Sequence, residues 1–141
     1  MMKKFLKKKL GNEKGMTLIE LLAVIVILAI IAAIAIPAIG SIIDNSRYGA
    51  SKSDIQNAFA SANLYKAQDG VAPASLSDLE PFMESKGTIQ ALTISENATT
   101  DKIEMLGEVE INDIVYTFTK IDSQTLSEQS VKEFKAILTE K

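Results

Sequence analysis

Apolar and polar positions divide the chain into three contrasting stretches. Residues 1–15 are mostly basic and polar, the sixteen residues of 21–36 are all apolar, and residues 44–141 mix both kinds. The largely apolar stretch 16–43 would be about 42 Å long as a helix, at 1.5 Å per residue. Because the hydrocarbon core of a bilayer is about 30 Å thick, this pattern predicts a membrane-length helix. Pro37 would remove one backbone hydrogen bond and kink that helix.

The helical pattern continues beyond the apolar stretch. Residues 44–69 repeat at helical spacing, which predicts an amphipathic helix with one face turned to a core. Gly70 is placed to end it. The predicted face consists of Tyr48, Ile55, Phe59, Ala62 and Lys66.

The clearest strand signal lies in residues 108–120. Asn112-Asp113 is a candidate two-residue turn. That turn would pair Ile111 with Ile114 and Val109 with Tyr116, and Phe118 would follow on the same face. The pattern predicts a half-buried antiparallel hairpin, and hence an α+β fold in which a long N-terminal helix packs against a small antiparallel sheet.

Weaker local signals suggest further elements. Ser75 and Asp78 form a candidate capping box for a short helix through Leu76 and Leu79. Residues 88–94 and 102–106 are candidate strands. A C-terminal amphipathic helix is expected from the spacing of Val131, Phe134 and Leu138, with Thr125, Ser127 or Ser130 as competing caps and a strand or frayed tail as the alternative.

Charge is distributed unevenly along the 141 residues. The net charge is -3, yet residues 1–15 hold six Lys and one Glu, whereas residues 44–141 hold nine Lys or Arg and sixteen Asp or Glu. Lysines beside a spanning segment favour the cytoplasmic side, so the acidic body should face outward. The acidic excess also disfavours nucleic-acid binding by the body.

Composition removes several kinds of chemistry. The chain has no Cys and no His, which excludes disulfides, thiolate metal sites and the common catalytic triads. No cofactor motif is present. Glu104, Glu108, Glu110 and Asp113 form an acidic cluster for which a calcium site is conceivable and a solvated face is the preferred interpretation. Asn97-Ala98-Thr99 is an isolated glycosylation triplet.

Glu20 is the most informative single residue. It lies at the start of the apolar stretch, where a carboxylate in hydrocarbon costs about 2.5–3.5 kcal/mol at mid-membrane and less near an end. A secretory signal peptide cut after Ala35, leaving Ile36 as the first residue, would not explain this acid, and neither would a plain membrane anchor. We expect its partner to be the terminal amine of a neighbouring copy, exposed by cleavage after Gly15.

Residues 14–22, Lys-Gly-Met-Thr-Leu-Ile-Glu-Leu-Leu, together with the apolar run and Pro37, resemble the precursors of type IV pilins and pseudopilins. The resemblance implies cleavage between Gly15 and Met16 by a prepilin peptidase, N-methylation of Met16, an assembly role for Glu20 and a helix kink at Pro37. The first mature residue would be Met where the family usually has Phe, and the disulfide of many pilins is impossible here.

The resemblance also implies an organisation and a function. Residues 1–15 would be a removed leader, 16–43 the membrane and filament-core helix, and 44–141 the extracytoplasmic pilin domain. The protein would be no enzyme but a structural subunit, stored in the membrane and assembled into a helical homo-oligomer by an assembly platform and its ATPase machinery. Alternatives are a pseudopilin of a type II secretion or competence machine, or an exported or membrane-anchored binding domain.

Overall fold

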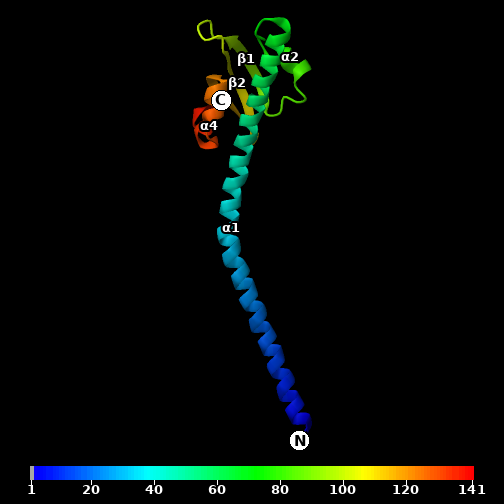
Figure 1. The fold of residues 1–141 in the computed structure, drawn as a ribbon. Helices are drawn as coiled ribbons and strands as arrows, with labels where there is room; N and C mark the ends of the chain where they lie inside the picture. Colours follow the sequence, from blue (N-terminus) through cyan, green and yellow to red (C-terminus); the bar gives the residue numbers. More distant parts are fainter. Residues whose placement is uncertain (1) are drawn as a thin grey trace. The chain divides into compact units, whose positions relative to one another are not determined.

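The computed structural model describes the backbone of residues 2–141 and the side chains of residues 17–141. The chain forms two compact units, Met1–Ile42 and Ile43–Lys141. We call the second unit the head. Helix α1, Met2–Asp69, contributes to both units and contains Pro37 (Figure 1). It ends at Gly70, whose φ of 76° lies in the left-handed region that favours glycine, as the sequence predicted.

The apolar part of α1 leaves its side chains exposed. The large apolar side chains of residues 18–36 are all at least half exposed, and Ile34 reaches 71%. From Thr17 onward, α1 is apolar and long enough to cross a membrane. Since apolar surface is unfavourable in water, this helix requires lipid or other helices around it.

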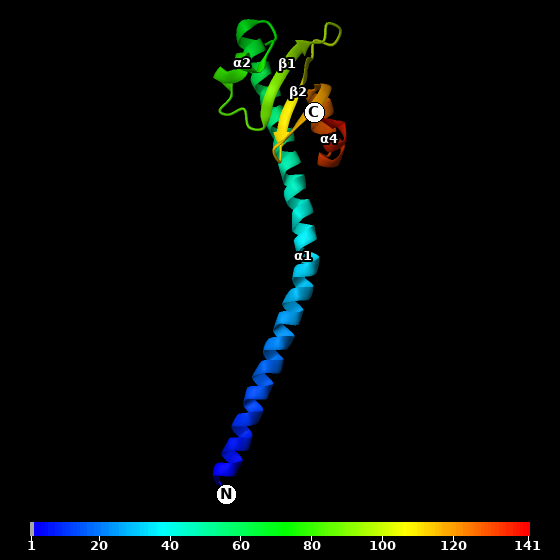
Figure 2. The same cartoon turned by 180° about the vertical axis from the view of Figure 1, so that it is seen from behind.

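The head contains one four-stranded antiparallel sheet in the order β1-β2-β3-β4. Its strands are β1 Ile89–Glu96, β2 Ile103–Ile111, β3 Ile114–Asp122 and β4 Leu138–Glu140. The outer half of α1 packs on one face of this sheet, as both views show (Figures 1 and 2). The predicted α+β architecture, a long N-terminal helix on a small antiparallel sheet, is therefore confirmed.

The register of the hairpin between β2 and β3 is also confirmed. Ile111 pairs with Ile114, and Val109 pairs with Tyr116. Asn112 and Asp113 have φ values of 57° and 63°, which is the backbone of a type I′ turn and matches the twist of the flanking strands. The candidate strand 102–106 is not a separate element, because β2 runs unbroken from Ile103 through Gly107 to the turn.

The core lies between α1 and the sheet. Tyr48, Ile55, Phe59 and Ala62 are buried, as their spacing predicted. They face a set of buried apolar residues from the strands and the short helices. That set consists of Leu79, Ile89, Leu92, Ile94, Ile103, Met105, Val109, Ile111, Phe118, Ile121, Leu126 and Phe134.

Short helices complete the head. They are α2 Leu76–Leu79, the 3-10 helix η1 Glu80–Phe82, α3 Ser123–Glu128 and α4 Val131–Ile137. The capping box of α2 is confirmed, since the backbone N–H of Ser75 donates to Asp78 at 2.9 Å.

The C-terminal prediction was partly wrong. Of the three candidate caps, Ser130 is the one that starts α4, through a capping box with Glu133. The helix ends at Ile137, and Leu138 pairs with Phe118 as the first residue of β4. Pairing with the free edge of β3 therefore replaces another helical turn. Helix α3 was not predicted; Asp122 caps it by accepting hydrogen bonds from the backbone of Gln124 and Thr125.

Candidate functional site

The candidate site at the N-terminal part of α1 is centred on Glu20. Its side chain is exposed, at the start of the exposed apolar run. Among residues 17–141, no basic side chain forms an ion pair with it. Gly15 and Met16, the expected cleavage and methylation positions, lie outside the residues whose surroundings the structure describes. The exposed carboxylate of Glu20 is therefore free to form an ion pair with a cation that is not among residues 17–141.

Pro37 lies inside α1, which continues as helix through residues 38–41. Ser41 donates its hydroxyl to the carbonyl of Ala38 at 2.9 Å, and a Cβ at Gly40 would meet nothing within 4 Å. Proline cannot donate the backbone hydrogen bond of a helix interior, so one hydrogen bond of α1 is missing here, and the kink at Pro37 stays a prediction.

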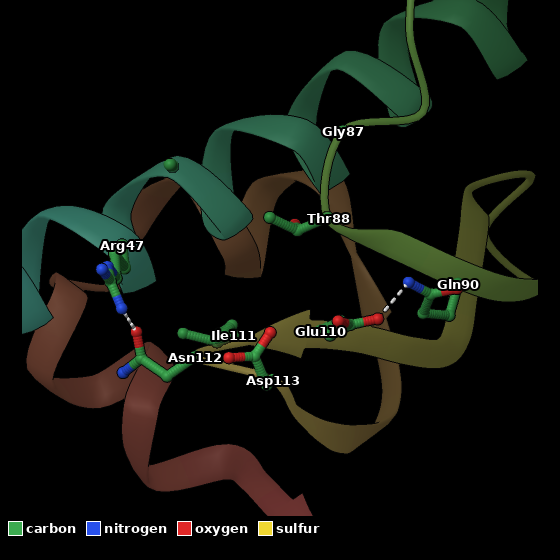
Figure 3. Close-up of a pocket in the computed structure, with 9 residues that line it drawn as sticks. Arg47, Gly87, Thr88, Gln90, Glu110, Ile111, Asn112 and Asp113 are labelled. Atoms are coloured by element: carbon green, nitrogen blue, oxygen red, sulfur yellow. Dashed lines mark hydrogen bonds between the residues drawn. The ribbon is translucent and has the colours of Figure 1, made fainter.

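The head carries a second feature, an open cleft of about 490 Å³. It lies between α1, the start of β1 and the turn of the β2–β3 hairpin (Figure 3). The lining residues are Arg47, Ala50, Gly87, Thr88, Gln90, Glu110, Ile111, Asn112 and Asp113. The cleft combines one cation with two carboxylates, so it suits a charged rather than an apolar partner.

One wall of the cleft is fixed by Asp54 on α1. Its carboxylate accepts hydrogen bonds from the backbone N–H and the hydroxyl of Thr88, both at 2.8 Å. Gly87 has a φ of 55°, and a Cβ there would come within 2.3 Å of the Asp54 carboxyl carbon. Glycine at this position lets the chain approach the helix closely enough for both bonds.

The charges of the cleft are only partly neutralised. Arg47 donates to the side-chain oxygen of Asn112, a neutral amide, and Glu110 accepts from Gln90 at 2.6 Å. No ion pair within residues 17–141 involves Arg47, Glu110 or Asp113. In Figure 3 the carboxylate of Asp113 lies between Asn112 and Glu110.

The predicted acidic cluster is divided among separate partners. Glu104 pairs with Lys120, and this hydrogen bond, assisted by one from Asn97, lowers the pKa of the Glu104 carboxyl. Glu108 pairs with Lys141 at 2.6 Å. No group of three or more metal-ligating side chains occurs among the described residues. Two of the four acids of the cluster are thus paired with lysines, and the solvated face stays a prediction.

The glycosylation triplet also has a structural interpretation. The Asn97 amide nitrogen donates to Glu104 at 2.8 Å, and its oxygen accepts from the backbone of Thr99 and Thr100. Asn97 thereby shapes the loop between β1 and β2.

Sequence reasoning did not find the cleft. Its walls come from residues 47, 87–90 and 110–113, which no local pattern connects. The only sequence signal was the acidic cluster, two of whose members, Glu110 and Asp113, do line it.

Comparison with known proteins addresses the N-terminal site. The family model described as the prokaryotic N-terminal methylation motif matches residues 10–36. No curated protein and no solved structure matches the chain. The motif match supports a prepilin of the type IV pilin and pseudopilin kind, which confirms the predicted resemblance, and the α+β fold is consistent with it.

The motif carries general implications. A prepilin motif implies processing by a prepilin peptidase and assembly into a filament, and pilin-type proteins are structural rather than enzymatic. The long apolar helix fits the membrane anchor typical of prepilins.

Proposed function

We propose that this chain is a structural subunit of a type IV pilus or a related filament, stored in the membrane and polymerised after its leader is removed. The observation that carries the proposal is the matched motif around a carboxylate, Glu20, on an otherwise apolar and exposed helix. A pseudopilus would use the same steps to build a shorter filament.

In this proposal the leader, residues 1–15, orients the precursor. Its six lysines hold the N-terminus in the cytoplasm, and the acidic head lies outside. A prepilin peptidase cuts between Gly15 and Met16. Cleavage removes a net charge of +5 that otherwise resists withdrawal of the helix from the membrane.

Cleavage also creates the partner for Glu20. The new amine of Met16 keeps its positive charge when it is methylated. In a bundle of such helices, the amine of one subunit meets the Glu20 carboxylate of another in a dry environment. Removing one member of a buried ion pair costs about 3–5 kcal/mol, so correct pairing fixes the axial register of each incoming subunit. An assembly platform and its ATPase machinery would supply the work of extraction.

Intact-mass analysis of the membrane and sheared surface fractions tests this proposal. The expected mature chain begins at N-methylated Met16 in both fractions. A chain that begins at Ile36 would indicate export by signal peptidase, and an uncut chain in a filament fraction would contradict processing.

Substitution at the cleavage site provides the matched test. Gly15→Leu should leave precursor in the membrane and no filaments, because a bulky side chain obstructs a peptidase that approaches the backbone. Gly11→Leu, four residues upstream in the same leader, is the control and should be processed normally. Equal processing of the two variants would overturn the assignment of the cleavage site.

A further inference from the structure

Opposite the cleft, the head presents a second charged surface, on α4. Lys132 is exposed and makes no hydrogen bond or ion pair with the described residues. Its neighbour Lys135 is held 4.5 Å above the Tyr48 ring, a cation–π contact that anchors α4 to α1. Lys132 is therefore the lysine of α4 available to a partner.

The two surfaces lie on opposite sides of α1. Arg47 and Ala50 line the cleft, whereas Gly49 faces Val131 at 3.7 Å and Lys52 donates to the carbonyl of Gln129, just before α4. At about 100° per residue, the mean direction of positions 47 and 50 differs from that of positions 49 and 52 by about 160°. Figures 1 and 2 agree, since α4 and the loop between η1 and β1 flank α1 on opposite sides at the same height.

Complementary patches at two different places on one chain generate open assemblies. A contact between unlike surfaces adds each copy to the last by the same rotation, and when that rotation does not close, the product is a helical filament. The cleft offers the carboxylates of Asp113 and Glu110, and α4 offers the ammonium of Lys132. None of these three groups has an ion pair among residues 17–141.

We propose that, in the filament, the cleft of one head receives α4 of a neighbouring copy, with Lys132 directed at Asp113 and Glu110. This inference rests on the proposed filament function and adds to it a lateral contact between heads. The cleft's own cation, Arg47, is already held by Asn112, whose amide also donates to Asp44 at 3.3 Å, so it is set apart from the entering lysine.

Such a contact tunes assembly rather than drives it. Partly exposed ion pairs are worth up to about 1 kcal/mol, or roughly fivefold in an equilibrium constant, and salt screens them. The contribution of the contact between heads to filament stability should therefore decline as ionic strength rises. The apolar helices supply most of the association free energy.

Crosslinking tests the contact directly, because the chain has no native cysteine. Sheared filaments of the double variant Glu110→Cys, Lys132→Cys should give a ladder of dimers, trimers and longer species with a short bis-maleimide. Each single variant should give no ladder, since a contact between unlike surfaces needs both thiols. The double variant Thr119→Cys, Lys132→Cys, with an exposed thiol on β3, is the mismatched control. Filaments that yield no ladder, or the same ladder from the control, would overturn the proposal.

Charge exchange supplies an independent readout. Lys132→Glu should reduce the number of surface filaments by roughly fivefold, as expected for one partly exposed ion pair. Adding Glu110→Lys should restore them, since the attraction is rebuilt in reverse. Normal N-terminal processing in all strains shows that the filament pathway is intact. Unchanged filament numbers in the Lys132→Glu strain would refute the contact between heads and leave the proposed filament function standing. If the wild-type strain made no filaments, the proposed filament function itself would be refuted.

Discussion

At the scale of single residues, Glu20 and Gly107 show two ways in which the residue type at one position limits the whole chain. Glu20 places a carboxylate on an apolar, exposed helix, where it has no ion pair among residues 17–141. Gly107 lies buried in β2, where a Cβ would approach the carbonyl oxygen of Ala91 to 2.2 Å. The first constrains assembly, and the second constrains folding.

Glu20→Ala should leave the protein made, inserted and largely cleaved but poorly assembled. Without the carboxylate, every buried terminal amine in the filament would lack its partner, at a cost of about 3–5 kcal/mol per subunit. Glu20→Asp should rescue assembly only partly, since the shorter side chain misplaces the charge. Filament counts and the size of the membrane pool measure the effect, with Ile27→Ala as a control that removes apolar bulk and no charge. Wild-type numbers of Glu20→Ala filaments would mean that this acid has another role.

Gly107→Ala should destabilise the head by about 1–3 kcal/mol, the usual cost of overpacking. The reason is that the contact is with strand backbone, which cannot rotate away as a side chain can. Gly49→Ala is the control, because its Cβ would meet only Val131 at 3.7 Å and alanine favours a helix. The free energy of unfolding of the full chain in detergent, followed by tyrosine fluorescence, decides between them, because all three tyrosines lie in the head. Equal stability of the two variants would contradict the proposed clash.

At the scale of elements, short helices are fixed by their first residues. Helix α4 has only seven residues, too few to be stable alone, so capping and packing must hold it. Ser130 and Glu133 exchange hydrogen bonds at its start, and Phe134 is fully buried beneath it.

Ser130→Ala should lower the free energy of unfolding by about 0.5–2 kcal/mol, the usual cost of losing a helix cap. Ser127→Ala is the matched control, because Ser127 was an equal candidate by sequence yet donates only to the carbonyl of Gln124 within α3. The same detergent unfolding experiment measures both. A larger loss from Ser127→Ala would place the important cap in α3.

At the scale of the whole molecule, carboxylates at loop ends couple the stability of the head to pH. Backbone hydrogen bonds from Ala74, Thr125 and Ser130 are the largest cause that holds the pKa of Asp78, Asp122 and Glu133, respectively, below their ordinary values. Hydrogen bonds with Glu96 and Asp101 raise the pKa of Lys66 above 10.5 and tie the end of α1 to the β1–β2 loop.

The head should accordingly be most stable over a broad neutral range, between about pH 5 and pH 10. A carboxyl with a lowered pKa stabilises the fold above its ordinary value, and that contribution is lost as pH falls through the lower folded value. The contribution of Lys66 is present below 10.5 and is lost as pH rises through its higher folded pKa. Amide hydrogen exchange in β2 and β3 across pH, corrected for intrinsic rates, measures this. Asp122→Asn should flatten the acid limb, and an unchanged acid limb would contradict its assignment to these caps.

Local features of the sequence determined much of this protein. The matched motif and the apolar run are contiguous, and the type I′ turn at Asn112-Asp113 fixed the hairpin register because two residues set the pairing of both strands. The buried face of α1 followed from helical periodicity, and its end followed from Gly70.

Tertiary structure alone decided the rest. Thr125 and Ser130 are each followed by a Glu three residues later, so local chemistry left both open as caps. Only the free edge of β3 made Leu138 a strand residue instead of a helical one. The cleft unites positions as distant as Arg47 and Asn112, 65 residues apart. Such proximity is created when the sheet closes on α1, because burial of the shared core offsets the entropy of bringing distant segments together.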